Sequence, residues 1–306
     1  MLVLIDFNLL SRQPVVVLLA ETGSGKTTQV PQFLLSAKVC REKKIAITQP
    51  RRMAAVSLAR RVAQETGTEL GGLVGFRVRF QDQSDSSTRL LYQTDGMLLR
   101  EAMLDNKLSR YSWVVLDEAH ERTVNTDILF GVVKVKYRFV LHITVHWQNT
   151  MNQAAVKSRG AGSSEGPLKV VIMSATVDAD RFSQYWGCPV LYVPGRQFPV
   201  NIRHVSESTE DWQKAMLSTI FNIHKEAPAQ EDVLAFLTGQ EEIESMARQV
   251  RSIAKEFPDR PRLEVVTLYA AKPVEQQQQV FKRTGANCRK VRGFIYNNLS
   301  TLETHR

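Results

Sequence analysis

The sequence contains few cysteines and no long uninterrupted apolar run. Its three cysteines, Cys40, Cys188 and Cys288, are odd in number, far apart and without metal-ligand spacing. This argues against a disulfide framework or a zinc site and predicts free thiols in a reducing compartment. Charged and proline residues interrupt the apolar stretch 1–20 before 18 apolar residues accumulate. With no basic n-region or cleavage site there, we expect a protein without a membrane segment.

Acidic residues are also in deficit. Forty Lys and Arg against 31 Asp and Glu give a formal net charge of +9, a balance that suits polyanionic partners. The excess is local, because residues 132–170 and 282–306 each hold six Lys or Arg and one Glu. The remainder of the chain is close to neutral, so composition alone does not identify a binding surface.

Short runs of branched apolar residues alternate with longer stretches that are compatible with helices. The runs are Val15–Ala20, Lys44–Thr48, Trp113–Leu116 and Leu168–Met173. Such alternation predicts a parallel sheet covered on both faces, so the expected fold class is α/β, doubly wound. The length of 306 residues is sufficient for two domains.

The pattern breaks near Pro194–Pro199 and then starts again. Apolar residues at helical spacing follow Ser208 and Asp211, which form a capping arrangement. Beyond that helix we expect a strand, a helix and a strand over residues 232–237, 241–257 and 263–268. We therefore predict a first domain at 1–195 and a partial second α/β domain at 196–306.

A glycine-rich turn directly follows the first apolar run. It reads Ala20-Glu-Thr-Gly-Ser-Gly-Lys-Thr27, with Ala20 where the strict phosphate-binding pattern has glycine. Backbone N–H groups of such a turn cradle phosphate oxygens, while Lys26 reaches the β- and γ-phosphates and Thr27 ligates Mg²⁺. We favour a nucleotide phosphate site over a structural turn. Its predicted binding residues are Glu21, Thr22, Gly23, Ser24, Gly25, Lys26, Thr27 and Thr28.

Paired carboxylates end another apolar run, in Trp113-Val-Val-Leu-Asp117-Glu118-Ala-His120. The carboxyl edge of a parallel sheet is where ligands of open α/β folds bind. Asp117 can hold Mg²⁺ through water, and Glu118 can polarise the water that attacks a γ-phosphate. An acidic pair at a helix N-terminus is the alternative, but the preceding glycine-rich turn favours a site. Thr27, Asp117 and Glu118 are the residues that we predict to bind the metal.

These two motifs, with others in matching order, resemble the DEAH-box helicases of superfamily 2. The resemblance extends from about Val15 to Val291, apart from one internal stretch, and is greatest to a nuclear or nucleolar RNA helicase. The matching segments are AETGSGKTTQ at 20–29, TQPRR at 48–52, TDGMLLRE at 94–101, DEAH at 117–120, HERTVNTD at 120–127, MSAT at 173–176 and FLTGQEEIE at 236–244.

The resemblance implies an RNA-stimulated ATPase and ATP-dependent RNA helicase with RecA-like lobes, which uses ATP and Mg²⁺. It implies catalytic roles for Glu118 as base, for Lys26, and for His120, which couples toward the second lobe. It also implies a monomer in the nucleus, nucleolus or cytoplasm, with RNA and an activating protein as partners. An unrelated P-loop nucleotide kinase is the weaker alternative, because the other motifs would then need separate explanations.

The resemblance further assigns residues outside the phosphate site. It implies that Ser174 and Thr176 couple the phosphate state to the grip on RNA. It implies that Arg61 and Phe281 sandwich the adenine, as guanidinium and aromatic stacking allows. RNA contacts are implied for Arg51, Arg52, Thr94, Asp95, Gly96, Thr238 and Gly239.

Structural explanations stay open beside these roles. Arg51 and Arg52 are compatible with a solvated helix start as well as with phosphate contacts. The hydroxyls of Ser174 and Thr176 could instead satisfy backbone groups at a strand end. Phe281 suits a core position. Asp95 is expected to cap a helix, and Thr238 with Glu241 forms a capping box that leaves an RNA contact open.

The resemblance is lost at two places. Residues 135–167 include an apolar, β-rich run without a counterpart, and the sequence after Val291 lacks the motifs that bring arginine fingers. Since an arginine finger contributes about 10³–10⁵ in rate, we expect slow turnover and no unwinding by this chain alone. The alternative function is an ATP- or RNA-binding fragment. Intron-derived or isoform-specific sequence at 135–167 and 292–306 is our hypothesis for both departures.

Overall fold

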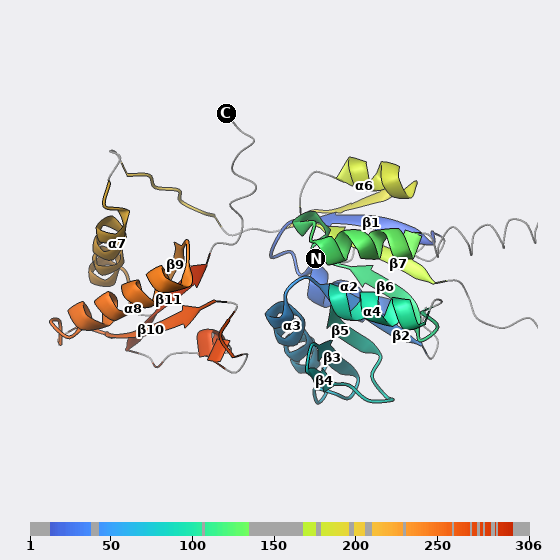
Figure 1. Ribbon diagram of the computed structural model, residues 1–306, viewed down its shortest axis with the longest axis horizontal. Helices are drawn as coiled ribbons and strands as arrows, with labels where there is room; N and C mark the ends of the chain where they lie inside the picture. The colour runs from blue at the N-terminus through green and yellow to red at the C-terminus, as the bar shows by residue number, and fades with distance from the viewer. Residues whose placement is uncertain are drawn as a thin grey trace, which may run out of the picture. The chain divides into compact units, whose positions relative to one another are not determined.

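The computed structural model divides the chain into two compact units, Met1–Pro199 and Val200–Arg306 (Figure 1). Thr176, Ser208 and the departure at 135–167 lie outside the described residues. None of the described helices combines the length and the hydrophobicity that a membrane span requires. The structure describes residues 13–37, 43–105, 108–134, 168–175, 179–195, 199–205, 210–228, 231–258, 260–269, 271–273, 276–277, 279–282, 285 and 287–295.

The first unit is built on an eight-stranded sheet with the order β4-β3-β5-β2-β6-β7-β1-β8. All neighbouring strands pair in parallel except β3 and β4. The predicted α/β class with a mainly parallel sheet is therefore confirmed. The strands are β1 (Val15–Ala20), β2 (Lys44–Gln49), β3 (Val74–Val78), β4 (Gln81–Gln83), β5 (Leu90–Thr94), β6 (Tyr111–Leu116), β7 (Lys169–Ser174) and β8 (Val190–Val193).

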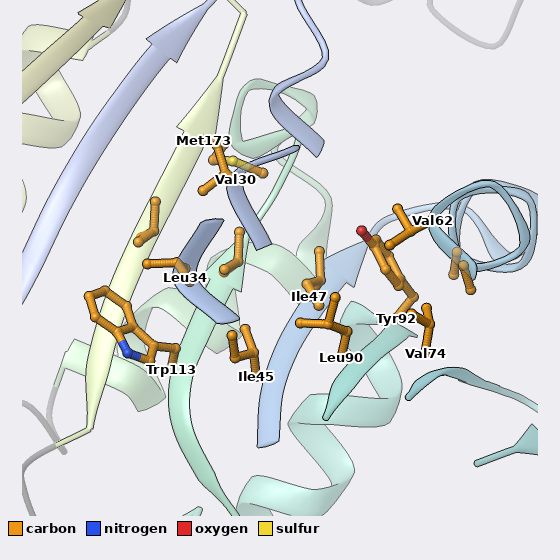
Figure 2. Close-up of a cluster of buried hydrophobic side chains, with 14 of the residues drawn as sticks. Val30, Leu34, Ile45, Ile47, Val62, Val74, Leu90, Tyr92, Trp113 and Met173 are labelled. Carbon is orange, nitrogen blue, oxygen red and sulfur yellow. The ribbon is translucent and has the colours of Figure 1, made fainter. Parts of the chain in front are cut away.

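Helices cover both faces of this sheet because successive strand residues point to opposite sides. In β1, Val16 and Leu18 pack into one buried cluster with α2 and α3, part of which Figure 2 shows. Val15 and Val17 pack into a second cluster with α4, α6 and the helix at 124–134. The labelled helices are α2 (Lys26–Ser36), α3 (Arg52–Glu65), α4 (Asp95–Leu104), the 3₁₀ turn η2 (Ala119–Glu121) and α6 (Ala179–Trp186).

The second unit has a three-stranded parallel sheet in the order β10-β11-β9. One face of β9 is buried and the other exposed, in strict alternation. The buried face packs against α7 and α8, which contribute Ile220, Ile243 and Val250. The elements are α7 (Trp212–Glu226), β9 (Val233–Leu237), α8 (Gln240–Ala254), β10 (Arg262–Leu268), η3 (Gln279–Phe281) and β11 (Cys288–Ile295).

Two of the predicted caps are wrong in detail. The N-cap of α4 is Thr94, and Asp95 is the first helical residue. The N-cap of α8 is Gly239, and the backbone N–H and hydroxyl of Thr238 both donate to Glu242 in place of the predicted Glu241. In each case the spacing located the helix start, but backbone geometry moved the cap or its partner by one residue.

Candidate active site

The glycine-rich turn links β1 to α2 at the carboxyl edge of the first sheet. Gly23 and Gly25 both have φ of 81°, a left-handed conformation that glycine adopts without steric cost. Gly25 is the N-cap of α2, so the turn presents backbone N–H groups and a helix N-terminus to the same space. The hydroxyl oxygen of Ser24 is buried without a partner among the described residues. An orphaned donor here fits a missing phosphate oxygen.

Lys26 and Glu118 meet across this edge. The Nζ of Lys26 lies 3.5 Å from Oε1 of Glu118, and the lysine side chain is only 5% exposed. Glu118 has φ of 52°, a left-handed conformation that costs a non-glycine residue about 1 kcal/mol or more. The strained backbone therefore directs the predicted base toward the predicted phosphate-binding lysine.

Thr27 and Asp117 also lie together, although 90 residues separate them in the chain. The Thr27 hydroxyl donates to Oδ2 of Asp117 at 2.5 Å, and the backbone N–H of Glu118 donates to Oδ1 at 2.9 Å. Burial, reinforced by the charge of Glu118, raises the pKa of Asp117 to about 6 despite the Thr27 bond and the Lys26 charge. A buried carboxylate of this kind gains from a nearby cation.

These residues fit a magnesium ion. Mg²⁺ prefers oxygen ligands and is usually held by one or two carboxylates, waters and substrate phosphates. The Thr27 hydroxyl and the Asp117 carboxylate supply hard oxygens side by side. A complete protein cage is absent from the described residues, where no group of three His, Cys, Asp or Glu could hold a metal. This donor set suits a metal shared with a nucleotide.

Two residues of this site were missed by the sequence analysis. Gln49 is 2% exposed, and its Nε2 donates to Oδ2 of Asp117 at 2.6 Å. The hydroxyl of Tyr92 donates to the backbone carbonyl of Thr27 at 2.9 Å. The position of Gln49 at the carboxyl end of β2, beside the arginine pair, is the signal that could have identified it.

His120 connects the carboxylates to the end of β7. Its Nε2 lies 3.4 Å from Oε2 of Glu118, and its Nδ1 accepts the backbone N–H of Ala175 at 3.4 Å. Ser174 precedes this contact and is fully buried. The predicted coupling residues Ser174 and His120 are thus neighbours, and Thr176 lies outside the described residues.

The predicted RNA-contact arginines flank the start of α3 and are exposed. Arg51 forms a salt bridge with Glu121 at 3.2 Å, and Arg52 donates to the carbonyl of Arg79 at 3.0 Å. Exposed ion pairs of this type are weak, so a phosphate can replace the carboxylate as the partner of Arg51. Their RNA contact stays a prediction.

Asp95 differs from the other predicted RNA-contact residues because its side chain is buried. It is 1% exposed and accepts the Thr126 hydroxyl at 2.5 Å. Burial raises the pKa of this carboxyl. The structure therefore gives the Asp95 side chain an internal role and leaves it unavailable to RNA, whereas the neighbouring Thr94 and Gly96 are half-buried.

The two residues predicted to contact the adenine, and Thr238 of the second unit, are exposed. Arg61 pairs with Glu65 one helical turn away, at 2.7 Å. Phe281 is 61% exposed in η3, which argues against a core role. Thr238 is exposed and Gly239 half-buried at the carboxyl end of β9. The adenine sandwich and the contacts of Thr238 and Gly239 with RNA stay predictions.

Comparisons with known proteins agree with this geometry. The family model for DEAD/DEAH box helicase matches residues 7–183. The chain is 50% identical over 277 residues to the ATP-dependent RNA helicase DHX33 of Homo sapiens, covering 90% of this chain and 36% of that protein. It is 44% identical over 300 residues to the pre-mRNA-splicing factor ATP-dependent RNA helicase DEAH10 of Arabidopsis thaliana, covering 92% and 42%.

A solved structure is also similar to this fold. The crystal structure of the Escherichia coli DEAH/RHA helicase HrpB matches with a TM-score of 0.74 and 28% sequence identity. The match covers 94% of this chain and 33% of that one. The chain therefore spans a third to less than half of the length of these similar proteins.

Proposed function

The chain belongs to the DEAD/DEAH box helicase family, as the sequence resemblance indicates, and we propose that it is by family an RNA-stimulated ATPase and ATP-dependent RNA helicase, with slow turnover by this chain alone. The observation that carries this proposal is the junction of Lys26 and Thr27 with Glu118 and Asp117 at one sheet edge. The resemblance assigns ATP and Mg²⁺ to this junction.

Each side chain has a definable task in ATP hydrolysis. Lys26 exchanges its contact with Glu118 for the β- and γ-phosphates, and the backbone N–H groups of residues 23–27 hold their oxygens. Thr27 and Asp117 hold Mg²⁺, which neutralises charge on the phosphates. Glu118, released from Lys26, accepts a proton from the water that attacks the γ-phosphorus while ADP leaves.

In the proposal, His120 couples ATP hydrolysis to the contacts with RNA. It touches both Glu118 and the backbone at Ala175, so loss of the γ-phosphate changes its surroundings directly. Arg51, Arg52, Thr94, Gly96, Thr238 and Gly239 are the RNA-contact residues of the proposal, and Arg61 and Phe281 hold the adenine. A monomer, a protein activator and a nuclear or nucleolar location complete the proposal by resemblance.

Nucleotide binding and hydrolysis test the proposal on the whole chain. A fluorescent ATP analogue should bind in the presence of Mg²⁺, and Lys26→Ala should weaken binding by at least about tenfold because a charge-assisted phosphate contact is lost. Arg60→Ala, which removes an exposed cation from α3, is the matched control. Equal affinities of wild type and Lys26→Ala would contradict the site.

Phosphate release with and without single-stranded RNA separates the two candidate activities. RNA-stimulated release that Glu118→Gln abolishes supports the ATPase. Nucleotide binding without RNA-stimulated release would instead favour the ATP- or RNA-binding fragment that is the alternative function.

A further inference from the structure

A second concave surface lies in the second unit, at the opposite edge of its sheet from Thr238. The pocket has a volume of about 540 Å³ and is lined by the C-terminal ends of α7 and α8, the loop between α8 and β10, and the first residues of β10. The sheet is parallel, and Thr238 follows the carboxyl end of β9, whereas the pocket lies at the amino end of β10. It is therefore separate from the proposed RNA contacts, and its volume suits a small ligand.

The pocket is strongly cationic. Among the described residues that line it, the one carboxylate, Glu264, lies 3.8 Å from the buried Nζ of Lys290, which offsets its charge. Across the described residues, none of the four cationic side chains of the pocket forms a salt bridge. Several cations around one concavity attract anions. The four side chains are those of Arg251, Lys255, Arg260 and Arg262.

Two of these guanidinium groups are fixed by backbone carbonyls. Arg251 donates to the carbonyl of Val265 at 2.9 Å, and Arg260 donates to the carbonyl of Lys225 at 3.2 Å. A guanidinium carries five N–H donors, so each keeps donors for a second acceptor. The planar forks are thereby oriented before a ligand arrives, which reduces the entropy lost on binding.

His224 adds an unsatisfied polar atom to this pocket. The residue is only 6% exposed, it lines the pocket, and its Nδ1 has no hydrogen-bond partner among the described residues. Burial and the charges of Arg289 and Arg260 lower the pKa of His224, which favours the neutral ring. A neutral imidazole carries its one proton on Nδ1 or on Nε2, and with the proton on Nδ1 that atom is a buried donor without a partner. Such a donor can bind an acceptor that a ligand supplies.

Aromatic side chains form the apolar part of the lining. The rings of Phe221 and Phe257 have centroids 6.0 Å apart and planes inclined by 39°, and Phe257 is 48% exposed. An exposed aromatic face stacks nucleobases without regard to their identity. An inorganic anion such as phosphate has no group that could pack against these aromatic rings.

We propose that this pocket binds one nucleotide unit, with its phosphate held by Arg251, Lys255, Arg260 and Arg262 and by His224, and its base against Phe257. The unit is a free nucleotide or a residue of an RNA strand that passes the edge of the second unit. The site is distinct from the phosphate-binding turn of the first unit.

Calorimetric titration of the Lys26→Ala chain without Mg²⁺ isolates the pocket from the first site. Uridine 5′-monophosphate should bind saturably, and Lys255→Glu with Arg262→Glu should weaken binding by at least about tenfold, since two charge-assisted contacts become repulsive. His224→Phe, which preserves the packing, should also weaken it. Arg248→Glu reverses an exposed cation of α8 outside the pocket and should have no effect.

The source of the nucleotide unit follows from a second titration. Tighter binding of a 5′-phosphorylated oligouridylate, with the same response to the variants, identifies an RNA strand, and equal affinity identifies a free nucleotide. Binding that the pocket variants leave unchanged, or no saturable binding, would overturn the proposal. Inorganic phosphate that binds as tightly as the nucleotide would overturn the role of the aromatic rings.

Discussion

Asp117 should make the ligand-free chain less stable as the pH rises. Burial raises its pKa from 3.8 to about 6 in the folded chain, so the folded state retains a proton that the unfolded state has released. The stabilisation is fully present below the unfolded pKa and is lost as the pH rises through about 6. A difference of about two pKa units corresponds to about 3 kcal/mol of unfolding free energy.

Denaturant unfolding of wild type and Asp117→Asn between about pH 4 and pH 7.5 measures this effect, with tryptophan fluorescence, to which the buried Trp113 contributes, as the reporter. The unfolding free energy of the variant minus that of wild type should rise by about 3 kcal/mol across this range. Glu69→Gln, at an exposed carboxylate, is the control and should show a flat difference. A flat difference for Asp117→Asn as well would refute the reasoning.

Three further substitutions test particular contacts. Gln49→Ala removes a donor from the metal carboxylate and should weaken Mg²⁺–nucleotide binding by about tenfold, measured by titration. Gly75→Ala places a Cβ 2.6 Å from the backbone carbonyl of Gln83 and should lower the unfolding free energy by about 1–3 kcal/mol. Arg289→Ala removes bonds to three carbonyls from a fully buried cation and should destabilise the second unit by at least about 3 kcal/mol in a denaturant titration.

Each of these three substitutions is matched by a control substitution in the same compact unit. Gln64→Ala removes an exposed amide of α3, and nucleotide binding as weak as in Gln49→Ala would argue against a specific contact. Gly131→Ala introduces a Cβ with nothing within 4 Å, so an equal loss of stability there would contradict the predicted clash. Arg248→Ala removes an exposed guanidinium, and a cost as large as that of Arg289→Ala would contradict the role of the carbonyl bonds.

Much of the fold was predictable because its signals are local. The run Val15–Ala20 forms β1 with the predicted bounds, and the glycine-rich turn after it begins a helix. β3 and β4 were not predicted, since they are short and lie between helices without a clear apolar run. The caps at Thr94 and Gly239 shifted because dihedral angles, and not residue types alone, decide where a helix begins.

The environment of individual side chains was less predictable. Asp95 was predicted to contact RNA, but its side chain is 1% exposed, whereas Phe281, for which a core position was the alternative to adenine contact, is 61% exposed. Burial depends on which residues pack from other elements. The Thr126 hydroxyl that donates to the Asp95 carboxylate is 31 residues away in the chain. A local sequence pattern does not indicate a hydrogen-bond partner so far away in the chain.

The sequence by itself determined which chemistry this chain carries. A strand, a glycine-rich turn with Lys26 and Thr27, and a strand that ends in Asp117 and Glu118 predict a phosphate and metal site, because each motif is contained in a few consecutive residues. Their type and order also revealed the family.

Only the tertiary structure decided which side chains meet. Gln49 and Asp117 are 68 residues apart, and they meet because β2 and β6 are parallel neighbours whose carboxyl ends share one edge. The same sheet order places His120 against the end of β7. In the second unit, His224 and the four cations converge from α7, α8, β10 and the loop between α8 and β10. Strand order and helix packing are long-range properties, and they create contacts that no stretch of sequence contains.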